Sequence, residues 1–416
     1  MSEKNHALLA FGLFAVALVA APYVFSSGLA ITMLCLMGVM IIFALSYNML
    51  LGQTGLLSFG HAVYYGLGGF CAAHAMNYVA RHKLGVPLPV IPLVGAAAGL
   101  FFGAVLGSVT TRRAGTVFAM ITLGIGELVA ALSGIQRSFF GGEDGIATNR
   151  AKLEPFFGYK FGPQIQVYYL IAVWCFICVA LMYALTRTPL GRMCNAARDN
   201  PERAEFVGYS TQRIRYLSFV LSAMFAGVAG SLTAINFELM NSQAIGAAAS
   251  GQVLLMTFVG GISHYVGPII GAVLVTFLQI SLSDITKAWM LYFGLLFIVV
   301  VMYAPSGIAG LIGMHQPLLR GGRIFKLVPS YAMALVPLAA AGLGLIALVE
   351  MAHHMLVAAA FSGPMVHLFG MTFSGASPVP WIIALAAFLG GAYGLKLVRP
   401  RIDEAWAAAE AGEEKA

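Results

Sequence analysis

The sequence predicts an all-α, polytopic membrane protein, a bundle of about 10–12 membrane segments with some broken or re-entrant helices. The chain of 416 residues is 60% hydrophobic and only 9% charged, whereas soluble domains carry roughly 25% charged residues. Apolar stretches long enough to cross a bilayer recur along it. Basic residues cluster between these stretches, as they do in cytoplasmic loops, so the net charge of +7 does not indicate nucleic-acid binding.

Ten stretches are expected to span the membrane. The first could be the core of a secretory signal, but a second span follows directly, which favours a retained helix. Residues 249–283 are too long for one span and short for two. Gly260-Gly261 and Gly267-Pro268 break this stretch, which predicts a hairpin. The ten are residues 7–25, 29–50, 58–79, 88–110, 115–135, 166–186, 215–236, 289–304, 329–349 and 380–398.

The distribution of basic residues favours the hairpin and places both termini in the cytoplasm. With the hairpin, sixteen of the 23 Lys and Arg residues are cytoplasmic, as expected from the positive-inside bias. A single span at 249–283 would place Arg320, Arg323 and Lys326 outside. The sixteen are Lys4, Arg112, Arg113, Arg187, Arg192, Arg198, Arg203, Arg213, Arg215, Arg320, Arg323, Lys326, Lys396, Arg399, Arg401 and Lys415.

The most polar internal segment is 187–215, with six arginines and three acids. Thr188 before Pro189 predicts the start of one short helix, and Asn200 before Pro201 predicts the start of a second. Gly208 is expected to end the second helix in a left-handed conformation.

Thr211 is expected to cap the following span. The segment is either a basic loop that orients the chain or a docking element for a soluble partner. For docking, Arg198, Asp199 and Glu202 would pair with charges, while Ala204 and Val207 are small enough to enter a groove.

Polar residues at membrane depth mark a candidate pathway. Gly52, Gly55 and Gly60 interrupt the helix between the second and third spans. Irregular backbone at this depth persists only where protein or a water-filled path satisfies it. The polar groups either line a route or pack through local hydrogen bonds. They are Asn48, Gln53, Thr54, Ser58 and His61.

Glu127 is an acid in the middle of a predicted span, where ionisable groups are costly and are usually functional. It is either part of the route or a carboxyl held by a neighbouring helix. The largest outer loop, 136–165, contains GGEDG at 141–145, in which Glu143 and Asp144 form a solvated turn or a docking surface for an outside partner.

The five cysteines are expected to be free, and no metal site is predicted. The chain lacks GxxxxGK[ST], HExxH and GxSxG. A separate subunit would therefore have to bind any ATP and magnesium. An intramembrane enzyme using Glu127 and His61 has no motif to support it.

Five stretches together resemble the permease subunits of branched-chain amino acid ABC transporters, and a closing YAPSGIAGLI at 303–312 matches the usual end of that family. The resemblance covers about residues 28–313. The stretches are FALSYNMLLGQTGLLSFGHAVYYGLGG (43–69), ITLGIGELV with GGEDGI (121–146), LGR with ARDNPERAEFVGYS (190–210), SAMFAGVAGSL (222–232) and SGQVLLMTFVGGISHYVGPIIGA (250–272).

The resemblance implies a binding-protein-dependent importer in a bacterial cytoplasmic membrane, not an enzyme. Its expected partners are a second permease subunit, two ATPase subunits and a soluble binding protein outside. Branched-chain amino acids are the expected solutes, and the alternatives are urea, short amides or aromatic acids, which relatives carry. The implied ATPase-coupling residues are Gly191, Arg192, Arg198, Asp199, Asn200, Glu202, Ala204, Val207 and Gly208.

A self-sufficient ion-coupled carrier with Glu127 as its ion site is the alternative of a different class. It would have no need of the charged double helix at 187–215. The predicted domains are a permease body, residues 1–315, and an extension, residues 316–416, with two further spans and a polar cytoplasmic tail. The tail is expected to form a short helix or to remain disordered.

Overall fold

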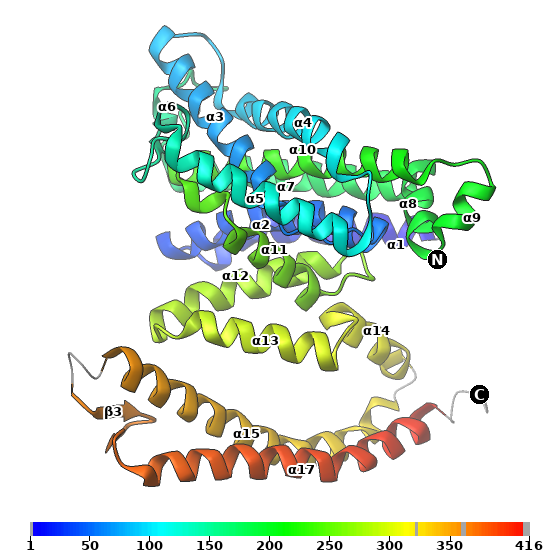
Figure 1. Cartoon of the computed structure of the whole chain (residues 1–416), viewed down its shortest axis with the longest axis vertical. Coiled ribbons are helices and arrows are strands. Elements are labelled where there is room, and N and C mark those ends of the chain that lie inside the picture. Colours follow the sequence, from blue (N-terminus) through cyan, green and yellow to red (C-terminus); the bar gives the residue numbers. More distant parts are fainter. Residues whose placement is uncertain (1–2, 321–322, 359–362, 411–416) are drawn as a thin grey trace. The chain divides into compact units, whose positions relative to one another are not determined.

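The computed structural model of the protein describes residues 3–320, 323–358 and 363–410, and these are almost entirely helical. They divide into two compact units (Figure 1). Unit 1 comprises residues 1–281 and 297–310, and unit 2 comprises residues 282–296 and 311–416. The boundary predicted at residue 315 remains a prediction.

Unit 1 contains the first part of the chain. Its helices are α1 (Glu3–Val24), α2 (Gly28–Thr54), α3 (Ala62–His82), η1 (Leu88–Val90), α4 (Ile91–Thr110), α5 (Gly115–Ile135), α6 (Arg137–Phe140), η2 (Arg150–Lys152), α7 (Gln164–Arg187), α8 (Pro189–Asp199), α9 (Pro201–Phe206), α10 (Thr211–Phe237), η3 (Ser242–Ala244), α11 (Ala247–Gly260) and most of α12 (Gly267–Ile285). It also contains the paired strands β1 (Ile146–Ala147) and β2 (Leu239–Met240).

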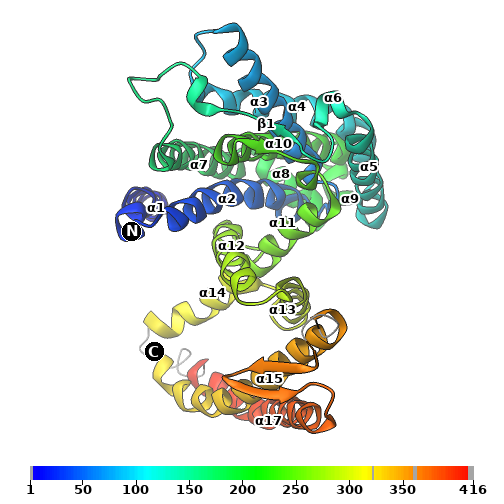
Figure 2. The ribbon, with the colours of Figure 1, turned by 90° about the vertical axis from the view of Figure 1, so that its left-hand side faces the viewer.

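Helix α10 lies in the interior of unit 1, packed against α2, α3 and α4 (Figure 2). Small residues make this possible, because without a side chain two helix backbones can approach closely. A Cβ atom on Gly227 of α10 would lie 2.1 Å from the Gly95 carbonyl oxygen of α4. On the α3 side, a Cβ atom on Gly230 would lie 1.7 Å from the Tyr65 carbonyl oxygen. Backbone contact therefore fixes the position of α10.

The break predicted within 249–283 is confirmed, whereas a membrane hairpin formed by its two arms remains a prediction. Helix α11 ends at Gly260 and α12 begins at Gly267, so the break falls at the two predicted glycine pairs. A Cβ atom on Gly271 would lie 1.8 Å from the Met256 carbonyl oxygen, which shows that the two arms are in backbone contact.

Unit 2 is built on a long antiparallel helix pair, α15 (Val328–His353) and α17 (Pro378–Glu410). Gly344 and Gly391 allow the pair to meet closely. Its connection carries a π-helical turn (His354–Ala358) and the antiparallel strands β3 (Met365–Leu368) and β4 (Met371–Ser374). The remaining elements are α13 (Trp289–Tyr303) and α14 (Gly307–Arg320), which are divided between the units, and η4 (Arg323–Lys326).

The polar tail continues the last helix instead of forming a separate one. Helix α17 extends to Glu410, and Trp406 near its end donates a hydrogen bond to the Tyr331 hydroxyl over 3.0 Å. His315 Nε2 lies 2.9 Å from the same hydroxyl oxygen. The tail is therefore helical and packed as far as it is described, and residues 411–416 lie outside the described part.

Eight helices in the described residues are long and apolar enough to cross a membrane, and the bent pair α13–α14 raises the number to nine. Two shorter apolar helices, residues 8–24 and α11, add to these. Helix α3, predicted as a span, is not among the eight. An all-helical, polytopic membrane architecture is confirmed, whereas the number of crossings and the sidedness of the termini remain predictions.

The glycine contacts of α10 generate a stability test. Gly227→Ala would place a methyl group against the Gly95 carbonyl and should destabilise unit 1 by about 1–3 kcal/mol, as overpacking does. Gly12→Ala is the matched control, because no described atom beyond the neighbouring backbone of its own helix lies within 4 Å of a Cβ atom there. Thermal unfolding of the detergent-solubilised protein should show a lower midpoint for Gly227→Ala alone. Equal midpoints would show that α10 tolerates separation from α4.

Candidate functional site

Helices α8 and α9 lie at one end of unit 1 (Figure 1). The two predicted caps are confirmed. Thr188 Oγ1 accepts a hydrogen bond from the Gly191 amide over 3.3 Å, and Asn200 Oδ1 accepts one from the Arg203 amide over 2.9 Å. Gly208 has the expected left-handed conformation, with φ of +92°. Local capping thus defines a short helical pair between two spans.

The predicted cap of the following span is wrong by one residue. Ser210, not Thr211, accepts from the Arg213 amide, over 3.4 Å. The Thr211 hydroxyl instead donates to Glu205 Oε1 over 2.6 Å. This side-chain bond ties α9 to the start of α10.

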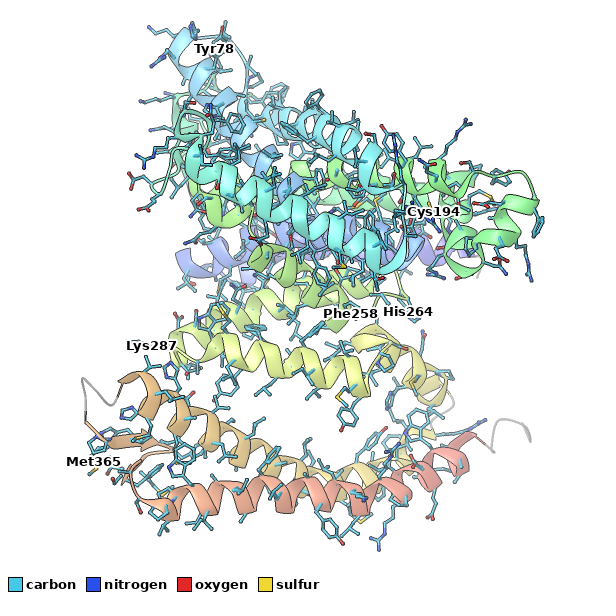
Figure 3. The ribbon with its side chains drawn as sticks, in the orientation of Figure 1. Tyr78, Cys194, Phe258, His264, Lys287 and Met365 are labelled. Atoms are coloured by element: carbon cyan, nitrogen blue, oxygen red, sulfur yellow. The ribbon has the colours of Figure 1, made fainter. Side chains whose placement is uncertain are left out.

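The inner face of α8 packs on α10. Cys194 and Ala197 form a small apolar cluster with Ile214; Figure 3 marks Cys194 at this end of the unit. Burial raises the pKa of the Cys194 thiol to about 11, although a hydrogen bond with Ser218 partly offsets this. The thiol is therefore protonated at neutral pH. Gly191 allows α8 to approach the end of α7, since a Cβ atom on it would lie 2.4 Å from the Leu185 carbonyl oxygen.

The outer face of the pair differs from the predicted one. Ala204, expected to be exposed, is only 6% exposed, because its side of α9 faces the protein. Phe206 is 90% exposed and Val207 is 70% exposed, so these two form the apolar tip of α9. Arg192, Asp199, Asn200, Glu202 and Gly208 are also exposed, as predicted for Asp199 and Glu202. Sequence reasoning missed Phe206 because a six-residue helix has too few turns to reveal its inward face.

Arg198 is only partly turned to solvent. Its Nε donates to Asp199 Oδ1 over 2.9 Å, and its Nη1 donates to the Gly52 carbonyl oxygen at the end of α2. The residue therefore links α8 to the glycine-rich break between α2 and α3.

That break, residues 55–61, is held by surrounding helices. Gly55 ends α2 in a left-handed conformation with φ of +69°. The Phe59 amide donates to Thr122 Oγ1 of α5 over 3.2 Å, and the Ala62 amide donates to Ser250 Oγ of α11 over 3.0 Å. Side chains of α5 and α11 thus satisfy two backbone amides of this irregular segment.

His61 lies at the centre of this packing and has no exposed surface. Its Nε2 lies 3.1 Å from Ser46 Oγ, and its ring is stacked on Phe43 and edge-on to Tyr47. Its Nδ1 has no hydrogen-bond partner among the described residues.

The other predicted pathway residues do not all meet. Asn48, Thr54 and Ser58 are buried near the break and Gln53 is half-buried, whereas Glu127 is exposed on α5. Helix α5 reaches the break with Thr122 and with Gly126, whose Cβ position lies 3.4 Å from the Gly60 Cα. Glu127 therefore belongs to a different face of α5 from the one that touches the break.

A pocket of about 190 Å³ opens beside the break. It is enclosed by the end of α2, by α8 and by the loop between α11 and α12, in which Figure 3 marks His264. Asn48 Oδ1 is buried there without a partner among the described residues. The lining residues are Asn48, Gly52, Gln53, Thr186, Asn195, Arg198, Ile262, Ser263, His264 and Tyr265.

The opposite end of unit 1 carries the GGEDG turn. Gly141, Gly142 and Gly145 all have positive φ, and Glu143 and Asp144 are exposed between them. The chain then pairs as β1 with β2, so the loop is attached to the far end of α10.

Arg150 fixes this loop, a role that sequence reasoning missed by counting it only as an outer charge. It is 8% exposed. Its guanidinium donates to the backbone carbonyls of Ile235 and Asn236 over 3.1 and 2.9 Å, and to Gln164 Oε1 over 3.0 Å. Further bonds run to the carbonyls of residues 161 and 162, and its amide donates to Glu238 Oε1. Four of these six acceptors are backbone carbonyls, and all six lie at least 11 residues away in sequence, so no local pattern reveals them.

A larger pocket of about 890 Å³ lies beside this loop, at the end of α3. Its lining includes Arg81, Lys152, His74 and Asn77, so positive charge collects there. Asn77 Nδ2 donates to the Ala147 carbonyl over 3.0 Å, which joins α3 to β1. In the described part of the chain, no three His, Cys, Asp or Glu side chains are grouped to hold a metal ion, and all five cysteines are free.

A family model and two relatives assign the chain to the same family of transport proteins. Residues 29–305 match the family model described as branched-chain amino acid transport system / permease component. The chain is 30% identical over 335 residues to the high-affinity branched-chain amino acid transport system permease protein LivM of Escherichia coli, covering 74% of this chain and 76% of that protein. LivM of Salmonella typhimurium is also 30% identical, over 73% and 74% of the two chains.

A weaker relative differs in its named solute. The fructose import permease protein FrcC of Rhizobium meliloti is 27% identical over 53% of this chain and 63% of its own length. No solved structure matches the chain.

The contacts of Arg150 predict a strong effect of its removal. Arg150→Ala would leave several buried carbonyls unpaired and should lower the free energy of unfolding by about 2–4 kcal/mol. Arg137→Ala, at an exposed position in the same loop, is the control. Thermal unfolding and limited proteolysis of the 136–163 loop would measure both. Similar stability of the two variants would contradict the role of Arg150 as an anchor.

Proposed function

Because the chain belongs to the branched-chain amino acid transport system permease component family, we propose that it is the membrane permease subunit of a binding-protein-dependent ABC importer. It would pair with a second permease subunit to form the translocation path. Separate ATPase subunits would bind ATP and magnesium, and a soluble binding protein would deliver the solute. The membrane is the bacterial cytoplasmic membrane.

The observation that carries the proposal is the capped α8–α9 pair, which projects an apolar tip between two spans. Import against a gradient requires free energy, which must reach this chain through a contact with another protein. Phe206 and Val207 would enter a groove of an ATPase subunit, because exposed aromatic side chains commonly anchor interfaces. Arg192, Asp199 and Glu202 around them would set the register of docking more than its affinity.

The same end of unit 1 would face the cytoplasm. The N-terminal half of α1 lies there, since Phe11 packs against Tyr183 near the end of α7. The turn between α4 and α5 lies there as well, because the Tyr216 hydroxyl at the start of α10 donates to the Ala104 carbonyl over 3.3 Å. This groups Arg112 and Arg113 with the arginines of 187–215, as the positive-inside bias favours. The C-terminus is proposed to be cytoplasmic on the charge argument alone.

The outer end would receive the binding protein. Exposed Glu143 and Asp144 stand on a turn that is anchored to α10, and the neighbouring pocket carries Arg81 and Lys152. Charges of both signs on a rigid surface suit the recognition of a soluble partner whose charges are complementary.

The path is proposed to include the break and the exposed face of α5. Asn48, Gln53, Thr54, Ser58 and His61 would determine the shape of the break, while Glu127 would face the second permease subunit or the solute route. A charged side chain within the membrane is costly unless it contacts protein or water. The exposed position of Glu127 on α5 therefore supports a contact with one of these. An ion-coupled carrier remains the alternative for Glu127, but the α8–α9 pair favours the importer.

Branched-chain amino acids are the proposed solutes, because the relatives named LivM are branched-chain amino acid permeases and match most of the chain. A weaker relative is named for fructose import, so a different solute is the alternative. Uptake of radiolabelled leucine by proteoliposomes containing the complete importer tests the assignment. Leucine uptake that needs ATP and the binding protein is expected. Uptake driven by an ion gradient without ATP would support the carrier instead.

The first prediction from this function concerns α9. Phe206→Glu should weaken association with the ATPase subunits at least about tenfold, since it replaces an apolar anchor by a charge that must be desolvated. Co-purification and ATP-driven uptake should both fall. Phe157→Glu is the matched control, because Phe157 is 85% exposed in the outer loop. Normal ATPase recovery with Phe206→Glu would exclude this tip from the contact.

The second prediction from this function concerns Glu127 of α5. Glu127→Gln removes the charge and keeps the shape, so transport should fall several-fold while the complex still assembles. Glu154→Gln, an exposed acid in the outer loop, is the control. Initial rates of uptake, together with the yield of assembled complex, measure the effect. Unchanged uptake would show that Glu127 is no part of the route.

A further inference from the structure

The end of α2 has a carbonyl group that its own helix does not use. The amides of Gly55 and Leu56, which close the helix, bond to Leu51 and Leu50 over 3.1 and 3.0 Å. The Gly52 carbonyl is left for another donor. The last carbonyls of a helix carry a partial negative charge, so a cation there is favourable.

Arg198 of α8 supplies that cation. Its Nη1 donates to the Gly52 carbonyl oxygen, while Nε is held by Asp199 Oδ1 at 2.9 Å. The guanidinium is thus oriented at both edges, as its planar fork allows. Charge-assisted bonds of this kind are roughly twice as strong as neutral ones.

The glycines of the break make the contact possible. A Cβ atom on Gly55 would lie 3.0 Å from Arg198 Cγ, so any larger residue would crowd the arginine stem. Gly55 also needs its left-handed conformation to end α2. The Arg198 side chain therefore lies directly across the point where α2 stops.

The space around the Arg198 guanidinium leaves room for that group to move. The pocket of about 190 Å³ beside Arg198 also contains Asn48, one helical turn before Gly52. Asn48 Oδ1 is buried without a partner in the described part of the chain, and Asn48 is 5% exposed. A guanidinium displaced from Gly52 would meet a second acceptor along the same helix face. Close-packed interiors rarely retain both an open volume and an unused acceptor.

We propose that Arg198 is the positioning residue through which displacement of α8 reaches the break between α2 and α3. The inference rests on the proposed function, in which ATPase subunits move α8. When α8 shifts, its guanidinium pulls on the Gly52 carbonyl and changes the end of α2, and with it residues 55–61. Arg198 thus acts inside this chain and not mainly as a charge presented to the ATPase.

The test compares variants of Arg198 in the complete importer. Arg198→Met keeps an unbranched stem over Gly55 but removes every donor. Solute imported per ATP hydrolysed should fall about tenfold, the factor expected for losing one charge-assisted hydrogen bond. Hydrolysis stimulated by the loaded binding protein, and the yield of complex, should stay near wild type. Arg198→Lys, which keeps a cationic donor, should restore part of the ratio. Arg213→Met, at an exposed arginine of the same segment, should leave it unchanged.

A second readout detects the movement itself. A cysteine at position 53, in a chain whose own five cysteines are alanine, should change its labelling rate when ATP binds. That change should be absent with Arg198→Met. An unchanged transport ratio, or a labelling response that persists in the variant, would overturn the proposal. So would parallel losses of uptake, hydrolysis and assembly, which would make Arg198 merely structural. If the wild-type complex itself shows no ATP-driven uptake, the proposed function fails and the inference with it.

Discussion

The backbone contact of α10 with its neighbours is the constraint on which unit 1 depends. In a membrane, burial of apolar surface does not drive helices together, because the lipid is equally apolar. Close packing and hydrogen bonds between helices must therefore stabilise their association. Gly227 and Gly230 bring α10 against the backbones of α4 and α3, and Ser222 Oγ donates to the Ser46 carbonyl of α2 over 2.5 Å. With three helices held this closely, α10 is positioned as a rigid element through the unit.

Both candidate functional ends are attached to this helix. Its first turn receives Ile214 contacts from α8 and the Thr211–Glu205 bond from α9. Its last turn supplies the carbonyls that hold Arg150, and the chain beyond it pairs with β1. Helix α2 before the break is likewise held by α10, because the Ser218 hydroxyl donates to the Met49 carbonyl over 3.2 Å. A displacement of α8 is therefore resisted by α10 but has a direct path into α2 through Arg198.

The parts predictable from sequence are those set by neighbours along the chain. Thr188 and Asn200 are recognisable as helix caps because each is a capping residue directly before a proline. The glycines at 260–267 locate the break in a stretch whose length alone did not decide between one span and two. The rest depends on contacts between distant residues. Arg150 binds carbonyls about 85 residues away, Arg198 binds Gly52 across 146 residues, and the inward face of α9 is decided by α8 and α10. The shift of a cap from Thr211 to Ser210 reflects competition from Glu205, which offers Thr211 a better partner.

In the proposed function, the α8–α9 end receives an ATPase subunit while the 136–163 loop faces away from it. Site-specific photo-cross-linking in intact cells tests this most directly, with the reactive side chain placed at position 206 or at position 157. We expect an adduct with the ATPase subunit from position 206 and none from position 157. An ATPase adduct from position 157, with none from position 206, would contradict both the docking site and the orientation.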